Sequence, residues 1–464
     1  MGNKQKALSS YEKSLEIERT SLPSNHPTFV TTYNNIGLVH QSMDDYSTAL
    51  SFYQKAYEVC EKNPQLSQSD EAASTFNKIG SAHHSMKEYS IALSFLEKAL
   101  EIQSNSSNPK HRSLAITYSN IGLACHEMND HQKALTYYEK ALEIEQKLLP
   151  DDHRDLATSY SNIGLVYDAM KDYRTALSFH EKALLIREKK MSSDDLVLAS
   201  TYNNIASTYY GMKDYSSAVS FYKKTLHIRE KSLAADDPTL ATIYNNIAVA
   251  YDLINDKSNA LTFYEKALEI RLRKLAADDP SLAAIYSSIA SIYYSKNDYS
   301  DAITFYQKAI EIHEKSSSSD DLELAIIYNN IALAYKSIGG LSNALVFYEK
   351  ALKIRVQKLP SNDPSLASLY SSIASIHSSN GNKSASLEFY EKSLKIQETL
   401  PSPNYSSMAV VYYNTAMSYE GLQNYEAALK HAERSVETAR LAFGPDHSEV
   451  KENQMLVDRL RNKR

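Results

Sequence analysis

One phrase of sequence returns ten times along the chain, and its spacing constrains the fold more than any other feature. The phrase at residues 202–206, Tyr-Asn-Asn-Ile-Ala, recurs in similar form every 42 residues, with a single step of 43 residues. A fixed period of this size indicates an array of repeated structural units rather than one globular core. The phrase begins at Tyr33, Phe76, Tyr118, Tyr160, Tyr202, Tyr244, Tyr286, Tyr328, Tyr370 and Tyr412.

Each repeat is predicted to be a pair of amphipathic helices. Apolar side chains fall at i, i+3, i+4 and i+7 over residues 202–209, and a similar spacing returns over residues 218–226. Residues 213–214, Lys-Asp, form a short polar turn between the two segments. Asp237 before Pro238 is typical of a helix start, because the carboxylate accepts hydrogen bonds from backbone amides and the proline ring fixes a helical φ. The predicted fold class is therefore all-α.

Composition excludes several classes of protein. Lys and Arg number 50 against 56 Asp and Glu, so the net charge is -6 and the positive field that attracts nucleic acid is missing. No run of about 18 apolar residues occurs, and residues 1–10 lack the apolar core of a secretory signal. Two cysteines, Cys60 and Cys125, are too few for a disulfide framework. These features predict a cytoplasmic protein that binds neither nucleic acid nor membrane.

The apolar positions resemble those of the tetratricopeptide repeat family. The match is carried by Tyr202, Ile205, Ala206, Tyr209, Ala218 and Tyr222. The 42-residue length, the Asn-Asn-Ile-Ala phrase, the Ala-Leu-Glu-Ile-Arg segment at residues 267–271 and the Asp-Asp-Pro linker resemble kinesin light chain repeats in particular. The resemblance implies a right-handed superhelical solenoid of helix-turn-helix repeats.

The repeat register divides the chain into three parts. Residues 1–22 match the second helix of an incomplete repeat, residues 23–444 hold ten repeats of one solenoid, and residues 445–464 are expected to form a C-terminal capping helix. Met1 falls at the repeat position that Met43 and later methionines occupy. We therefore expect that the chain is truncated upstream of Met1. The alternative is a genuine start with a frayed half-repeat.

No motif of an enzyme active site interrupts the repeats. The nucleotide-binding, metalloprotease and hydrolase motifs are absent from the sequence, so no catalytic residue, cofactor or small-molecule substrate is expected. One group has the residue types of metal ligands, namely His83, His84, Cys125, His126 and His131. Neighbouring repeats place such side chains on the order of 10 Å apart, whereas zinc needs ligands at about 2 Å. No metal site is therefore predicted.

Asparagine recurs on the first helices and supplies the candidate binding residues. It is a mediocre helix former, yet it fills the Asn204 position in seven of the ten repeats. The family resemblance implies that this position faces a concave groove, where a carboxamide can bond a partner's backbone through one acceptor and two donors. The alternative is that the amides orient one repeat on another. The candidate groove residues are Asn34, Asn35, Asn77, Asn120, Asn162, Asn203, Asn204, Asn245, Asn246, Asn329, Asn330 and Asn414.

Few charged residues fall on the predicted groove. Lys78 and Lys336 are its basic residues, and Asp168, Asp252 and Glu420 oppose them. A groove that clamps a carboxylate needs several basic residues, so a chaperone's terminal carboxylate and strongly acidic cargo motifs are disfavoured as ligands. A second basic series is expected to complement the dipoles of the second helices and comprises Arg187, Arg229, Arg271 and Arg355.

These features predict a non-catalytic scaffold or adaptor that binds proteins or peptides. The resemblance implies a kinesin light chain-like cargo adaptor and, with it, a kinesin motor complex as partner. The alternative is a recruitment or regulatory tail of a larger enzyme or signalling ATPase whose catalytic domain lies upstream of Met1. A third hypothesis is a structural spacer, in which the asparagines bind no partner.

Overall fold

The computed structural model describes residues 2–105, 111–192, 195–315 and 321–463, and within them all regular secondary structure is helical. The chain forms two compact units, which are treated separately below: the N-terminal unit, Met1–Ala235, and the C-terminal unit, Asp236–Arg464. Over the described residues, no helix combines the length and the apolar character that a membrane span requires.

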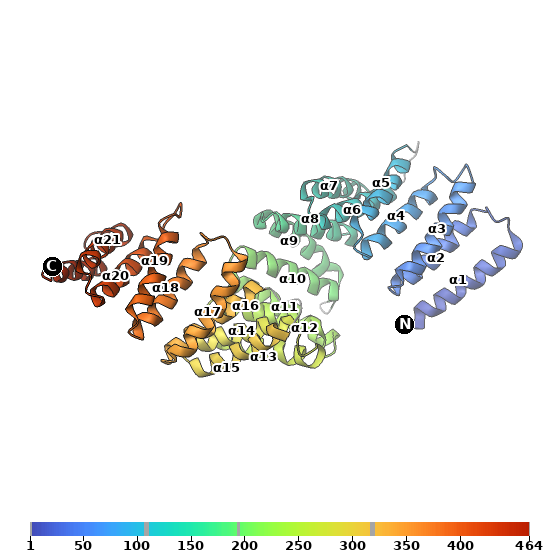
Figure 1. Cartoon of the computed structure of the whole chain (residues 1–464). Helices are drawn as coiled ribbons and strands as arrows, with labels where there is room; N and C mark the ends of the chain where they lie inside the picture. The colour runs from blue at the N-terminus through green and yellow to red at the C-terminus, as the bar shows by residue number, and fades with distance from the viewer. Residues whose placement is uncertain (1, 106–110, 193–194, 316–320, 464) are drawn as a thin grey trace. The chain divides into compact units, whose positions relative to one another are not determined.

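In the N-terminal unit each repeat contributes an even-numbered first helix and an odd-numbered second helix (Figure 1). Each first helix packs against its own second helix, against the second helix before it, and against the first helices of adjacent repeats. The helices are α1 (Gly2–Ser21), α2 (Thr28–Ser42), α3 (Tyr46–Lys62), α4 (Asp70–Ser85), α5 (Tyr89–Asn105), α6 (His111–Glu127), α7 (His131–Leu148), α8 (Arg154–Ala169), α9 (Tyr173–Lys190), α10 (Leu196–Gly211) and α11 (Tyr215–Ser232).

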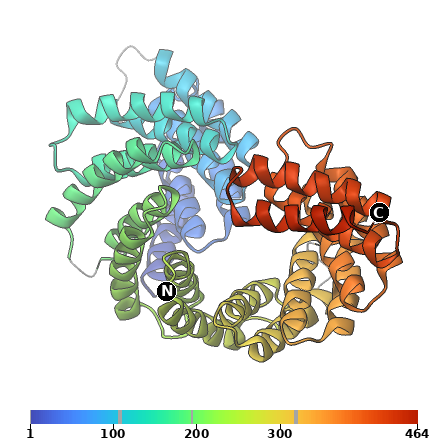
Figure 2. The ribbon, with the colours of Figure 1, turned by 90° about the vertical axis from the view of Figure 1, so that its left-hand side faces the viewer.

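The C-terminal unit repeats this pairing, and Figure 2 shows its helices lying side by side in pairs. The predicted fold of helix-turn-helix repeats is therefore confirmed in both units. The helices are α12 (Pro238–Leu253), α13 (Lys257–Lys274), α14 (Pro280–Ser295), α15 (Tyr299–Lys315), α16 (Asp321–Ser337), α17 (Leu341–Lys358), α18 (Pro364–Ser379), α19 (Lys383–Gln397), α20 (Tyr405–Gly421), α21 (Tyr425–Phe443) and α22 (Ser448–Arg461).

The turn inside a repeat depends on one left-handed residue. Lys213 has a φ of 64°, and Asp214 then caps α11 by accepting a hydrogen bond from the Ser217 amide at 3.1 Å. Gly339 and Gly381 hold the left-handed position in two later repeats, where the absence of a Cβ removes the strain. The short polar turn predicted from the sequence is confirmed.

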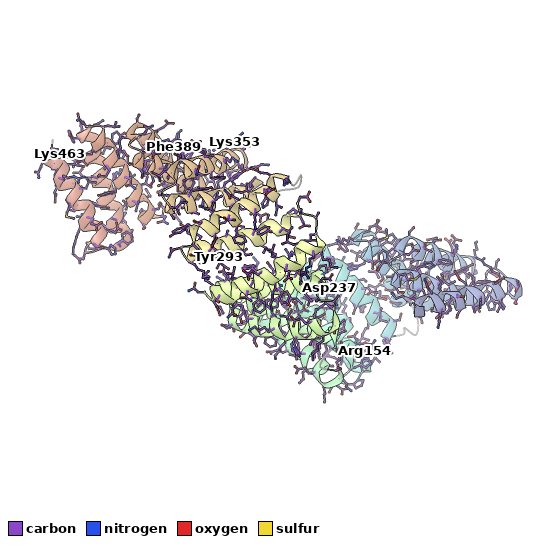
Figure 3. The ribbon with its side chains drawn as sticks, turned by 90° about the horizontal axis from the view of Figure 1, so that it is seen from below. Arg154, Asp237, Tyr293, Lys353, Phe389 and Lys463 are labelled. Carbon is purple, nitrogen blue, oxygen red and sulfur yellow. The ribbon has the colours of Figure 1, made fainter. Side chains whose placement is uncertain are left out.

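Aromatic side chains fill the space between the two helices of a repeat. Tyr209 stacks on Phe221 with 5.6 Å between ring centroids, and Tyr202 tilts against the same ring at 6.0 Å. The Lys224 ammonium lies 4.7 Å from the centroid of Phe221. Equivalent sets recur in both units, and Figure 3 labels one member, Phe389 of α19. The aromatic residues at the Tyr202 and Tyr209 positions therefore pack between the two helices of a repeat.

Polar side chains at the Gln103 position join several of the second helices to a neighbouring first helix. Gln103 donates to the Ser113 hydroxyl and accepts from Thr117, each at 2.7 Å. The same Thr117 oxygen accepts from Asn77 Nδ2 at 2.7 Å. This buried chain of hydrogen bonds links α4, α5 and α6 and satisfies groups that would be costly to bury alone.

The residue at the Gln103 position changes from repeat to repeat. Arg187 is buried and donates to the hydroxyls of Ser161 at 2.9 Å and Thr201 at 2.6 Å. Arg271 and Arg355 each donate to a backbone carbonyl at the start of the next first helix, at 3.1 Å. These arginines therefore tie adjacent helix pairs together, a role that the sequence analysis did not assign to them.

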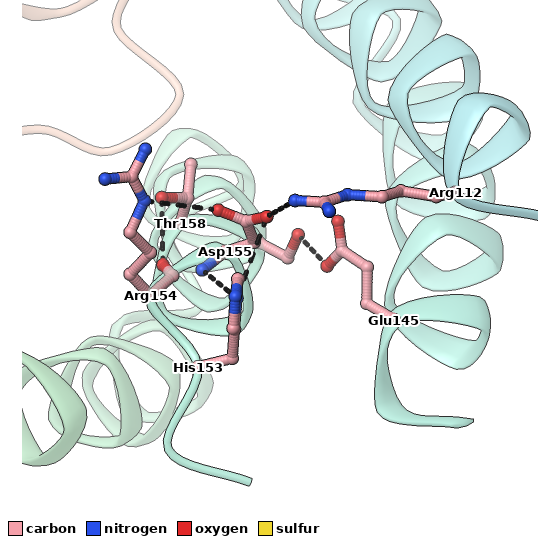
Figure 4. Close-up of polar contacts among 7 residues, drawn as sticks. Arg112, Glu145, His153, Arg154, Asp155 and Thr158 are labelled. Carbon is pink, nitrogen blue, oxygen red and sulfur yellow. Dashed lines mark hydrogen bonds and ion pairs between the residues drawn. The ribbon is translucent and has the colours of Figure 1, made fainter. Parts of the chain in front are cut away.

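One seam of the N-terminal unit carries an acid at this position (Figure 4). Glu145 accepts a hydrogen bond from Ser159 at 2.6 Å, while Asp155 nearby lies 3.3 Å from Arg112 and 3.7 Å from His153. Burial raises the pKa of Glu145 and the Asp155 charge adds to that rise, while Ser159 and His153 act in the opposite direction. The ionised form of Glu145 is therefore disfavoured by folding.

Replacement Thr117→Val should lower the free energy of unfolding by about 1–3 kcal/mol, because it leaves Gln103 Oε1 buried without a donor. Urea denaturation followed by circular dichroism measures the change. The control is Thr136→Val on the exposed side of α7, where the hydroxyl bonds only its own helix; it should change the value by less than about 0.5 kcal/mol. Equal losses in the two variants would contradict the role of the buried chain.

Replacement Glu145→Gln should raise the urea midpoint at pH 7, because it removes a carboxylate whose pKa is raised in the folded state and keeps an oxygen for Ser159. As the pH rises, Glu145 ionises near pH 4.5 in the unfolded chain and at a higher pH in the folded protein. The increase in the urea midpoint should therefore appear above pH 4.5 and vanish below it.

The control for this pH dependence is Glu143→Gln, two residues away on the same helix. Lys147 donates to Glu143 and lowers its pKa, so this replacement should not raise the midpoint at any pH. A gain from Glu145→Gln that persists at pH 4 would show that ionisation is not its cause.

Candidate partner-binding groove

An open pocket of about 310 Å³ lies on α2, α4 and α6 of the N-terminal unit. Its lining comes from first helices alone. Two predicted residues, Asn34 and Asn35, line the pocket together with Lys78. The other lining residues are Val30, Thr31, Asp70, Glu71, Ser74 and Ser113.

The seven asparagines at the Asn204 position are all half-buried, each on a different first helix. In one of them, Asn330 Oδ1 lies 3.5 Å from Asn329 Nδ2. The side chains of the other six form no hydrogen bond to any residue that the structure describes, so their donors and acceptors are available to water or a ligand. The six are Asn35, Asn120, Asn162, Asn204, Asn246 and Asn414.

The asparagines at the Asn203 position, one residue before the Asn204 position, fall into two groups. Asn34 and Asn77 are buried and brace neighbouring first helices: Asn34 Nδ2 donates to Thr75 at 2.9 Å, and Asn77 Nδ2 donates to Thr117. Their Oδ1 atoms are buried without a hydrogen-bond partner among the described residues. The donors of these two amides are therefore committed to the protein. The remaining members are half-buried and comprise Asn203, Asn245 and Asn329.

The hydroxyl partners of these braces were not identified from the sequence. They lie immediately before the first aromatic residue of a repeat. A Thr or Ser at that position is the sequence feature that could have identified them. The N-terminal unit has Thr32, Thr75, Thr117, Ser159 and Thr201 there, all buried. The C-terminal unit has aliphatic residues instead, namely Ile243, Ile285, Ile327, Leu369 and Val411. At this one position the first helices thus carry a buried hydroxyl in the N-terminal unit and a buried aliphatic side chain in the C-terminal unit.

The acids expected to oppose the groove lysines each have a partner within their own unit. The distances are 2.9 Å from Asp168 Oδ2 to His180 Nε2, 2.5 Å from Asp252 Oδ1 to Lys257 Nζ, and 2.7 Å from Glu420 Oε2 to Arg459 Nη2. Lys78 and Lys336 instead donate to hydroxyls, Ser74 at 2.8 Å and Ser375 at 3.1 Å. Neither lysine has a carboxylate within ion-pair distance among the described residues.

Burial also acts on one of these two lysines. It lowers the pKa of Lys78, because the ammonium is only partly hydrated inside the pocket. Among the groove residues named from the sequence, the three acids are thus paired and the two lysines are not, which the sequence did not indicate.

The histidine and cysteine residues considered as metal ligands lie on α4, α6 and α7. The rings of His126 and His131 lie 5.4 Å apart, and Cys125 is a free, buried thiol, as is Cys60. Over the residues that the structure describes, no three His, Cys, Asp or Glu side chains come close enough together to hold a metal ion.

Comparison with solved structures identifies similar folds. The apo form of RapI is 16% identical, with 80% of this chain and 97% of RapI covered and a TM-score of 0.57. A putative kinesin light chain from Podosopora anserina with nearly identical TPR-like repeats is 20% identical, with 45% and 100% covered and a TM-score of 0.41. BtubC (BKLC) from P. vanneervenii is 20% identical, with 54% and 92% covered and a TM-score of 0.40.

Comparison by sequence identifies the family. No curated protein matches the chain. A tetratricopeptide repeat model matches residues 1–62, 71–147, 131–189, 197–273, 281–355 and 323–399, and a second tetratricopeptide repeat model matches residues 408–449. Because these matches cover most of the chain, the chain belongs to the tetratricopeptide repeat family.

Proposed function

We propose that the chain is a non-catalytic scaffold that holds extended segments of partner proteins against its first helices. The observation that carries this proposal is the series of half-buried carboxamides at the Asn204 position, six of which have no hydrogen-bond partner among the described residues. Tetratricopeptide repeats are typically protein-interaction modules, and the family membership of the chain supports the same conclusion.

The chemistry of the amide explains why a peptide is the favoured ligand. A peptide backbone offers alternating donors and acceptors, and one carboxamide can pair with both. Asparagine costs helix stability relative to alanine, so its recurrence inside seven helices needs a compensating gain. At six positions no hydrogen bond to a described residue supplies that gain. Binding of a partner backbone would supply it with little dependence on the partner's side chains.

A kinesin light chain-like role is the finer form of this proposal. It rests on the 42-residue period and the Asn-Asn-Ile-Ala phrase in the first helices, and it gives the chain a kinesin motor complex as partner. A cytoplasmic setting belongs to the same proposal. The free thiols of Cys60 and Cys125 support it, since they suit a reducing compartment.

The triple replacement of Asn120, Asn162 and Asn204 by alanine tests the proposal. Peptides are first selected on the full chain from a displayed random library, and their affinities are then measured by fluorescence polarisation. The triple variant should bind them at least about tenfold more weakly, a loss of about 1.4 kcal/mol. It should unfold at the same temperature or higher, because alanine is the better helix former.

The matched control removes three hydroxyls from the second helices of the same repeats. Thr136, Ser178 and Ser220 occupy one exposed position on α7, α9 and α11, and their replacement by alanine should leave peptide affinity unchanged. If the asparagine variant binds every selected peptide as tightly as the natural protein does, the asparagines are not the contact surface and the spacer hypothesis is favoured.

A further inference from the structure

We infer that the N-terminal unit has a second interaction surface, a row of methionines at the ends of its first helices that binds a basic amphipathic helix of a partner protein. The methionine row consists of the residues that directly follow α2, α4, α6, α8 and α10, namely Met43, Met86, Met128, Met170 and Met212. It lies at the turns inside the repeats, about two helical turns beyond the Asn204 position. The inference therefore goes beyond the proposed function.

Four of the five side chains are exposed to solvent although they are apolar. The exposed fractions are 40% for Met86, 45% for Met128, 42% for Met170 and 38% for Met212, and Met43 is half-buried. A single exposed apolar side chain is common on a protein surface, whereas a series of them in consecutive repeats indicates an interaction surface. Because methionine is unbranched and polarisable, such a series can adapt to the apolar side chains of a partner.

Contacts between neighbouring helices hold the methionine row together. Gln41 Nε2, near the end of α2, donates to Ser81 Oγ of α4 at 3.1 Å. At the other end of the row, the ring of Tyr173 packs so closely on Gly211 of α10 that a Cβ there would clash. Consecutive first helices contact each other from α2 to α10. Packed helices are on the order of 10 Å apart, so the methionines at their ends follow one another at about that spacing.

This spacing fits an α-helix that lies along the row. An α-helix rises about 1.5 Å per residue, so seven residues span about 10.5 Å and complete almost two turns. Apolar residues seven positions apart therefore lie on one side of the helix and can contact consecutive methionines. An amphipathic helix that places its apolar face on an apolar surface is a recurring mode of peptide recognition.

The charges beside the methionine row indicate the charge of the partner. The five four-residue turns that begin with the methionines contain twice as many carboxylates as lysines. The carboxylates are Asp44, Asp45, Glu88, Asp130, Asp172 and Asp214, and the lysines are Lys87, Lys171 and Lys213. Asp130, Asp172 and Asp214 are exposed, accept hydrogen bonds from backbone amides and form no ion pair with a described residue. Lysine or arginine side chains of a partner helix would complement them.

The C-terminal unit provides a comparison at the same repeat position. The equivalent residues there are Ile254, Lys296, Ile338, Asn380 and Leu422, none of which is methionine. Since isoleucine and leucine also occur at this position, the end of a first helix does not itself require methionine. The C-terminal turns contain Asp256 and Asp298 as their carboxylates and carry more lysines than acids. This edge should therefore not bind a basic helix.

Three acetylated and amidated peptides test the inference on the full chain. The first repeats the heptad Leu-Ala-Lys-Leu-Ala-Lys-Ala three times, the second has Glu in place of every Lys, and the third has Ser in place of every Leu. Fluorescence polarisation at low salt should show that the first peptide binds at least about tenfold more tightly than the other two. Equal affinity for the first peptide and either of the others would overturn the inference.

Methyl NMR of the chain with isotope-labelled methionine methyl groups locates the bound peptide. The signals of the methionine row should shift when the first peptide is added. The signal of Met455, which is 64% exposed on α22, should not shift. Single Met→Leu variants assign the signals. A shift of Met455 as large as those of the row would show that the peptide binds any exposed methionine, which would overturn the inference.

The triple variant Met86→Ser, Met128→Ser and Met170→Ser should bind the first peptide at least about tenfold more weakly, because it removes the apolar contact. The matched control replaces the two isoleucines and the leucine at the equivalent position of the C-terminal unit by serine and should leave the affinity unchanged. If both variants bind the peptide as tightly as the natural protein, the methionine row is not the contact surface.

A second triple variant, Asp130→Asn, Asp172→Asn and Asp214→Asn, removes three carboxylates and keeps the helix caps, because Asn382 and Asn424 cap α19 and α21 with the same hydrogen bond. It should weaken binding of the first peptide about tenfold at low salt and less at high salt, where charges are screened. Unchanged affinity at low salt would overturn the basic character of the partner. The asparagine variant of the groove should bind this peptide as the natural protein does, so the two surfaces are tested separately.

Discussion

A single 42-residue helix pair cannot bury its own apolar face, and the rest of the structure depends on this constraint. Within each unit, a first helix packs against its own second helix and against the second helix before it, so a repeat depends on its neighbours for part of its stability. The aromatic set of Tyr202, Tyr209 and Phe221 closes the inside of a repeat, and the residues at the Gln103 position close the seam to the next one. The side of the first helices that carries the Asn204 position is then the surface that packing leaves available for a ligand.

Much of this arrangement follows from periodicity alone. The spacing of Tyr202, Ile205 and Tyr209 predicts the helix and its buried side, and Lys213-Asp214 predicts the turn. Such predictions succeed because they concern contacts within one repeat, where sequence distance is a fair guide to spatial distance.

The groove was harder to predict because its properties depend on side chains from other repeats. Asn34 and Asn35 are consecutive in sequence, but a helix rotates about 100° per residue. Asn34 therefore braces a neighbouring helix, while the Asn35 side chain has no hydrogen-bond partner among the described residues. Whether Asn77 is a brace depends on Thr117, 40 residues later. The charge of the groove also depends on contacts that the repeat pattern does not show. Asp252 counts as a groove acid in the sequence, but it forms an ion pair with Lys257.

The varied residues at the Gln103 position also bear on how such a chain avoids assembling in the wrong order. Ten similar repeats could in principle stack with a repeat skipped, since their aromatic cores are nearly interchangeable. The polar contacts between repeats are not interchangeable, because each needs its own partner. Gln103 is hydrogen-bonded to Thr117, Glu145 to Ser159, and Arg187 to a pair of hydroxyls. A skipped repeat would bury one of these groups without its partner, at a cost of about 1–3 kcal/mol for each orphaned group. The polar residues between repeats therefore favour the correct order of stacking over one in which a repeat is skipped.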